Sequence, residues 1–136
     1  MSLATWKRVY YPVPASKAAS SDREAVAHSL RKWRGLRKAA LQRHKVTRFG
    51  AVVIDASAGS LTINDRTCAL CQRYVVRQGY CSGCPLERVL GHPCDVDGAG
   101  TMRPSVYYEG VNGRPEPMIA ALAQAQRLVR RKRRAR

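Results

Sequence analysis

The sequence predicts a small α+β domain. Three observations lead to this class: apolar residues recur at helical spacing near both ends of the chain, short β-branched runs lie between them, and two tight cysteine pairs fall within residues 68–84. A length of 136 residues suits a single domain with a modest core. We therefore predict an extended N-terminal arm at residues 1–20, one folded domain at 21–126 and a basic C-terminal tail at 127–136.

The first half of the chain is expected to hold an amphipathic helix and a hairpin. Residues 1–20 contain two prolines and several serines, which favours the extended arm. Residues 21–24 match a capping box, and apolar residues follow at helical spacing, so we predict a helix over residues 22–42. Its apolar face consists of Val26, Leu30, Trp33, Ala40 and Leu41. The apolar runs 49–54 and 61–63, separated by Ala58-Gly59-Ser60, predict a short hairpin.

The second half is expected to hold two helices and one strand. Pro85 suits a first helical position and Gly91 a helix end, so residues 86–90 predict a short helix. Residues 95–100 are turn-rich and are interpreted as a loop. Val106-Tyr107-Tyr108 predicts another short strand. A final helix opens at Pro115 and runs into the basic tail.

The two C-x2-C pairs suit one tetrahedral metal ion. Each turn can aim two thiolates at a point about 2.3 Å away, and four thiolates complete the closed shell that zinc accepts in structural sites. Nine residues separate the pairs, which favours a compact arrangement of two knuckles and a connecting loop. We therefore predict a zinc-stabilised domain with one structural Zn2+. The predicted ligands are Cys68, Cys71, Cys81 and Cys84.

Cys84 precedes the short helix at 86–90 and would act as its N-cap. Backbone N–H groups and the positive end of the helix would then face its sulfur. This environment predicts a lowered thiol pKa and favours the thiolate that zinc needs.

A fifth cysteine leaves the ligand set open. Cys94 or His92 could replace one of the four thiolates, and iron is the alternative metal for a thiolate site. Disulfides are disfavoured because the amino terminus lacks the apolar segment of an export signal, and a reducing cytosol keeps thiols free. We expect a cytoplasmic protein, in a bacterial host if it is encoded by a phage.

Positive charge is the second strong signal. The chain carries 25 Lys and Arg against 9 Asp and Glu, a net charge of +16. Eight of the bases fall in residues 31–48 and seven in residues 127–136, whereas residues 49–126 hold six bases and seven acids. The cysteine-bearing middle is thus nearly neutral, and the flanks carry the affinity for polyanions.

The order of these features resembles a group of small cysteine-rich proteins encoded by bacteriophages. The resemblance covers roughly residues 26–126 and rests on the first C-x2-C pair, on Cys81-Ser82-Gly83-Cys84-Pro85-Leu86, and on the later Gly91 and Cys94. It implies a metal site and a bacterial or phage setting, and it implies no activity. The basic helix and tail depart from the group.

The predicted function is non-catalytic binding of nucleic acid, either DNA or RNA. Clustered bases neutralise phosphates and release counterions, so such binding is strong, salt-sensitive and largely blind to sequence. Arg73 and Arg77, interleaved with Tyr74 and Tyr80, suit phosphate contact with base stacking, although such tyrosines also commonly pack against the metal turn. The predicted contacts are Arg31, Arg34, Lys38, Arg73, Arg77, Arg127, Arg130, Arg131, Lys132, Arg133, Arg134 and Arg136.

The alternative function is protein docking. A small phage-type module or inhibitor, held in shape by its metal, could dock on an acidic host or viral protein or on a ribonucleoprotein. An enzyme is the third class and is disfavoured. Four thiolates leave no open metal position, and the three histidines form none of the arrangements that hydrolytic metal sites use. We expect neither a membrane partner nor a small-molecule substrate.

Overall fold

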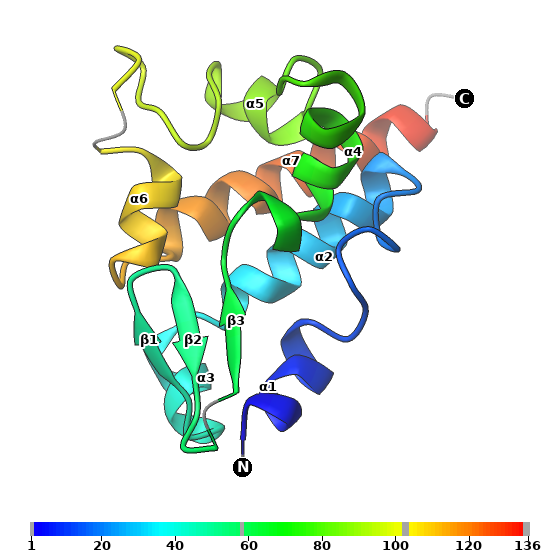
Figure 1. Ribbon diagram of the computed structural model, residues 1–136. Coiled ribbons are helices and arrows are strands. Elements are labelled where there is room, and N and C mark those ends of the chain that lie inside the picture. Colours follow the sequence, from blue (N-terminus) through cyan, green and yellow to red (C-terminus); the bar gives the residue numbers. More distant parts are fainter. Residues whose placement is uncertain (1, 58, 102–103, 135–136) are drawn as a thin grey trace.

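The computed structural model describes residues 2–57, 59–101 and 104–134, with side chains through residue 131. Helix α2 (Asp22–Arg34) crosses the middle of the molecule and packs against α7 (Glu116–Arg134) on one side and α4 (Ala69–Gln78) on another (Figure 1). The short helix α5 (Pro85–Leu90) covers a further part of α7. Apolar side chains from these helices form one core, so the predicted α+β class is confirmed at this level.

The sheet lies at one end of the helical layer and has three short antiparallel strands in the order β1, β2, β3. They span Thr47–Phe49, Val52–Ile54 and Ser60–Thr62. The predicted hairpin is confirmed for β2 and β3, where Val53 pairs with Leu61. The run 49–54 is divided, however, because Gly50 adopts a φ of 56° and turns the chain back from β1 into β2.

The extended arm predicted for residues 1–20 is wrong in its first half. Residues Leu3–Tyr10 form helix α1. Ser2 caps it by accepting a hydrogen bond from the Thr5 N–H, and Trp6 is fully buried with its indole N–H donating to the carbonyl of Gly35 at 2.8 Å. Burial of one face against α2 therefore stabilises a helix that proline content alone argued against.

The single helix predicted over residues 22–42 is also wrong. It divides into α2 and α3 (Lys38–Arg43). A Cβ on Gly35 would lie 2.5 Å from Tyr10 Cγ, so only glycine allows α1 to approach this closely. Arg37 then adopts extended backbone angles before α3 begins. The predicted apolar face is nevertheless buried or half-buried throughout.

The strand predicted at residues 106–108 is wrong as well, since Val106–Val111 form helix α6. Ser105 caps this helix by accepting a hydrogen bond from the Tyr108 N–H at 3.0 Å. The backbone of Gly110 lies directly against the Trp33 ring. Packing against α2 thus outweighs the β-propensity of Val106 and the two tyrosines. The predicted helices at 86–90 and after Pro115 are confirmed as α5 and α7.

Candidate metal centre

The first cysteine pair lies at the amino end of α4. Cys68 is the N-cap residue of this helix, and its sulfur accepts a hydrogen bond from the Cys71 N–H at 3.3 Å. A short 3-10 turn, η1 (Asp65–Thr67), leads from β3 into this cap. The segment predicted as a loop between the pairs is mostly the helix α4, which ends at Gly79 with a φ of 86°. Both sulfurs are therefore held within the first turn of a core helix.

The other cysteines flank α5. Cys84 is its N-cap residue, and the Cys84 N–H donates to the Cys81 carbonyl at 2.9 Å, which closes a tight turn around Gly83. Gly91 ends α5 with a φ of 81°, and the chain returns to place Cys94 beside α6. The Cys94 carbonyl accepts a hydrogen bond from the Tyr107 N–H at 3.0 Å, which anchors that return.

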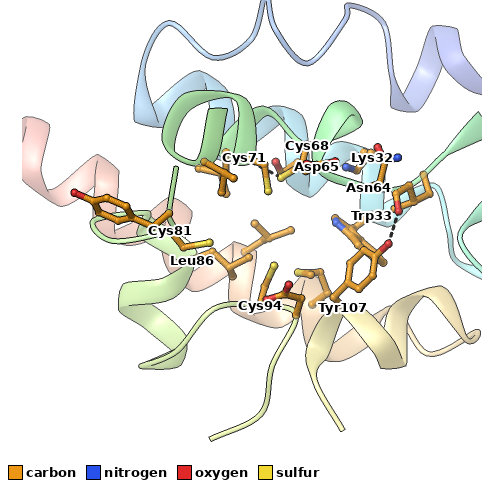
Figure 2. A pocket seen from close by; sticks show the side chains of 18 of the residues that line it. Lys32, Trp33, Asn64, Asp65, Cys68, Cys71, Cys81, Leu86, Cys94 and Tyr107 are labelled. Carbon is orange, nitrogen blue, oxygen red and sulfur yellow. Dashed lines mark hydrogen bonds between the residues drawn. The ribbon is translucent and has the colours of Figure 1, made fainter. Parts of the chain in front are cut away.

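These segments bring all five cysteines to one place. A cavity of about 20 Å³, close to the space one water molecule needs, is lined by Cys68, Cys71, Cys81, Cys84 and Cys94. In Figure 2 the labelled cysteines from α4, from the turn before α5 and from the loop after it surround a common space. All five are free thiols. Across the ranges that the structure describes, no three His, Cys, Asp or Glu side chains stand as a ready-made metal shell.

A larger cavity of about 360 Å³ adjoins the thiols. Cys68, Cys71, Cys81 and Cys94 line it, and Cys84 does not. Its other walls are largely apolar and include Trp33, Leu70, Leu86 and Leu122. His92 lines neither cavity, and its Nδ1 lies 2.9 Å from the carbonyl oxygen of Pro93. Of the two substitute ligands considered from the sequence, only Cys94 is brought to the thiols.

The surroundings shift the pKa values of the thiols in different directions. A hydrogen bond with the Cys71 thiol lowers the pKa of Cys68 to about 5, with help from the charge of Lys32 and from the Cys71 N–H. The same hydrogen bond raises the pKa of Cys71, and burial adds to that shift. Burial also raises the pKa of the Cys81 and Cys94 thiols. Cys68 is therefore the one cysteine whose surroundings favour the thiolate.

The lowered pKa predicted for Cys84 is wrong. Burial raises the pKa of this thiol to about 11, although the backbone N–H groups of Glu87 and Leu86 act in the opposite direction. Desolvation of a thiolate in this wall outweighs the stabilisation that the end of a two-turn helix provides. A divalent cation would reverse the balance, because a thiol that coordinates a metal is deprotonated.

Sequence reasoning missed Lys32. Its side chain is only 1% exposed, it lines the larger cavity beside Cys68 and Cys71, and its Nζ donates to the carbonyl of Thr67 at 2.7 Å. Burial lowers the pKa of Lys32, whereas negative charge on Cys68, Cys71 and Cys94 acts to raise it. The helical period could have predicted the burial of Lys32, because this residue lies seven residues after Ala25 and three after Ser29, on the same buried face of α2.

Most of the predicted nucleic-acid contacts are exposed. Arg31, Arg34 and Lys38 lie on the solvent side of α2 and α3, Arg77 is exposed near the end of α4, and three more arginines are exposed on α7. These three are Arg127, Arg130 and Arg131. The predicted basic tail continues α7 as far as Arg134; the side chains of Lys132, Arg133 and Arg134, and the whole of Arg136, lie outside the described residues.

Arg73 is placed differently. It forms an ion pair with Asp22 at 2.7 Å and donates to the carbonyl of Ala19 at 3.1 Å. Tyr74 donates its hydroxyl hydrogen bond to the same carboxylate. Both side chains therefore join α4 to the start of α2, and only Arg77 and Tyr80 of this group face solvent.

No helix within the described parts of the chain combines the length and apolar character needed to cross a membrane. Comparisons of the chain with models of known protein families, with curated proteins and with solved structures find no match. They neither support nor contradict the resemblance to phage-encoded proteins. Functional inference for this chain therefore depends on its own geometry and charge.

Proposed function

We propose that this protein binds nucleic acid through exposed arginines and lysine on α2, α3 and α7, and that a thiolate-bound zinc ion braces the helices that carry them. We name these bases the arginine surface. The arginine surface consists of Arg31, Arg34, Lys38, Arg127, Arg130 and Arg131.

The observation that carries the proposal is the absence of carboxylate partners on this surface. Within the described residues, the ion pairs join Arg37 to Glu116, Arg73 to Asp22 and Arg114 to Glu109. None of them involves a member of the arginine surface. Exposed cations without intramolecular counterions attract polyanions, and each phosphate they neutralise releases condensed counterions.

The helix pair places the two groups of bases on one rigid support. Arg37, which lies just after α2 and caps α3, pairs with Glu116 at the start of α7, so α2 and α7 run antiparallel. Figure 1 shows the carboxyl end of α7 close to the beginning of α2. Because the helices run antiparallel, the bases near the end of α2 and those near the end of α7 lie toward opposite ends of the pair. Both helices bury apolar faces in the same core, which fixes the distance between the two groups.

Zinc is proposed on the chemistry of the donors. Five thiols line one small cavity, and four are enough for the tetrahedral shell of a structural zinc ion. Such an ion would be held by Cys68 and Cys71 with two of the other three cysteines. It would link the start of α4, which packs on α2, to the segments that flank α5, which packs on α7.

Salt-dependent binding of labelled oligonucleotides tests the proposal. We expect fluorescence anisotropy to show affinity for both single-stranded and double-stranded DNA and RNA, falling steeply between about 50 and 200 mM salt. A triple variant of the surface, Arg31→Gln, Arg34→Gln and Lys38→Gln, should weaken binding and flatten the salt slope. The matched control removes the same charge elsewhere, through Arg66→Gln, Arg88→Gln and Arg114→Gln. Equal effects of the two triple variants would contradict the proposed surface.

A groove between α5 and α7 favours docking of an acidic protein segment as the second candidate. Its volume is about 600 Å³, and Val89, Leu90, Ala120 and Arg127 are among the residues that line it. Arg127 is the charged residue of this lining, which suits an apolar segment carrying carboxylates.

A pull-down with and without nuclease separates the two candidates. Loss of every partner on nuclease treatment favours nucleic-acid binding. A stoichiometric protein that survives nuclease, and that is lost when Ala120→Asp places a carboxylate in the groove, favours docking.

A further inference from the structure

Helix α2 directs two buried polar side chains at the thiols. Ser29 and Lys32 are each 1% exposed, lie three residues apart and line the larger cavity together with Cys68. No hydrogen bond of normal geometry reaches the Ser29 hydroxyl within the described residues, yet this hydroxyl lies near enough to Cys68 to help lower the pKa of that thiol. Among the described residues, Lys32 has one hydrogen-bond acceptor, the Thr67 carbonyl, for the three donors of its ammonium, and its Nζ lies 5.9 Å from the centre of the Trp33 ring. Figure 2 places Lys32 close to Cys68 at this wall.

An ammonium without a counterion is costly at this depth. Transfer of an ion into a protein interior costs several kcal/mol unless an opposite charge and hydrogen bonds compensate. None of the ion pairs in the described chain includes Lys32. Burial alone lowers the pKa of Lys32 and favours the neutral amine, whereas negative charge in the cavity would keep the ammonium form.

The cavity offers few other anions. Its remaining titratable lining residues are Asp65 from η1, Tyr80 just after α4, Asp95 from the loop after α5 and Tyr107 from α6. Tyr80 is exposed. Both carboxylates are exposed and neither pairs with Lys32. The Tyr107 hydroxyl already donates to the carbonyl of Ile63 at 2.6 Å. The sulfurs that face Lys32 are thus the remaining source of negative charge.

We propose that Ser29 and Lys32 are donors built to support an anionic metal-thiolate centre. Four thiolates around one divalent, thiophilic cation carry two excess negative charges. The Lys32 ammonium offsets one of them, and the Ser29 hydroxyl donates to the sulfur of Cys68. Both are positioning residues, since neither is itself a metal ligand. This inference depends on the proposed metal centre and adds the residues that hold it.

The charge role and a purely structural role predict different effects of Lys32→Met. If Lys32 serves only the fold, the substitution destabilises the chain by the same amount with and without metal. If Lys32 balances the centre, the substitution costs more stability with metal than without it, because the metal-bound thiolates carry more negative charge than the metal-free thiols. It then lowers metal affinity about 10-fold to 100-fold, the range known for residues that support metal ligands.

The experiment uses Co2+ and Zn2+ as probes on the full chain, prepared anaerobically. Competition with a chromophoric chelator gives the affinity, and the thiolate-to-cobalt charge-transfer band reports the electron density on sulfur. We expect weaker affinity and a shifted band for Lys32→Met, and smaller changes of the same sign for Ser29→Ala, which removes one atom and preserves the fold. The matched control is Arg31→Met, which removes an exposed charge from the same helix.

Each outcome separates this inference from the proposed function. Unchanged affinity and an unchanged band in both variants overturn the inference while the metal centre stands. A wild-type chain that binds neither ion overturns the centre and the inference together, whereas its affinity for oligonucleotides is measured independently. If the metal-loaded wild type does not bind oligonucleotides, only the proposed nucleic-acid function is overturned.

Discussion

Asp22 at the beginning of α2 and Arg73 within α4 form an ion pair with a separation of 2.7 Å between Arg73 Nε and the carboxylate. The same carboxylate accepts the hydroxyl hydrogen bond of Tyr74. Arg73, which sequence patterns assigned to phosphate, is therefore already neutralised inside the molecule. It connects α4, which contains Cys71 and is capped by Cys68, to the helix that carries Lys32.

This ion pair should contribute measurably to stability. We expect Asp22→Ala to lower the free energy of unfolding by about 2 kcal/mol, because it removes a charged acceptor from two partly buried donors. Urea unfolding measures the loss. Glu116→Ala is the comparison, since it breaks the more exposed pair with Arg37 and should cost below about 1 kcal/mol. Equal losses would show that burial adds nothing to the Asp22 pair.

The contact between α6 and α2 should not tolerate an added methyl group. A Cβ on Gly110 would overlap the Trp33 ring, so Gly110→Ala should destabilise the fold by about 1 to 3 kcal/mol. Gly98→Ala serves as the control, because nothing lies within 4 Å of its added Cβ. Thermal unfolding of both variants checks the expectation, and a stable Gly110→Ala would place α6 elsewhere.

Loss of one thiol from α4 tests the metal centre directly. We expect Cys71→Ser to reduce bound zinc and to lower the melting temperature, because metal binding contributes to folding free energy in small domains of this type. Elemental analysis gives the metal content, and wild type treated with a chelator gives the reference for the metal-free fold. A variant that keeps its full metal content and its melting temperature excludes Cys71 as a ligand.

Substitution of the α7 arginines tests their role in nucleic-acid binding more cleanly than deletion of residues 127–136. Val129 is buried within this stretch, so removing residues 127–136 would damage the core as well as the charge. We expect the change of Arg127, Arg130 and Arg131 to glutamine to flatten the logarithmic salt slope on duplex DNA by up to about 0.9 per lost phosphate contact. An unaltered slope with weaker binding would remove α7 from the interface.

Asp55 should impose a pH dependence at the acid end. Its carboxylate accepts hydrogen bonds from the Ser57 hydroxyl and from the Leu3 N–H, which lower its pKa from 3.8 to about 2. This stabilisation is complete above pH 3.8 and is lost as the pH falls toward about 2. The stability gap between wild type and Asp55→Asn should therefore be constant near neutrality and close in that acid window. Urea midpoints measured against pH test this, and a gap independent of pH would contradict it.

Local signals predicted the elements whose ends are encoded nearby. Ser21 caps α2, Pro85 and Gly91 bound α5, and the apolar period of α7 is regular, so these helices were found from sequence. Helix α1 was missed because its stability depends on distant partners, the carboxylate of Asp55 and the carbonyl of Gly35. Secondary structure that forms through tertiary contacts leaves a weak trace in local sequence.

In the candidate site, too, the features encoded by local sequence were predicted and those that depend on tertiary contacts were not. The spacing of Cys68 and Cys71 singled them out, and the spacing of the second pair did the same. The inclusion of Cys94 and the burial of Lys32 could not be read from spacing, because they depend on how α2, α4 and the loop after α5 fold together. From sequence, a lysine within a basic block is expected to be exposed to solvent, and only the packing of the core shows which face of the helix is buried.

The pairing of α2 with α7 also bears on biosynthesis. A ribosome delivers the first of these helices roughly a hundred residues before the second. Until then the apolar side of α2 has no final cover, and the nascent chain must remain in an open, chaperone-accessible state. The native state should accordingly form only after α7 has left the ribosome exit tunnel, and a stop codon before α7 should yield protein that is degraded and does not accumulate.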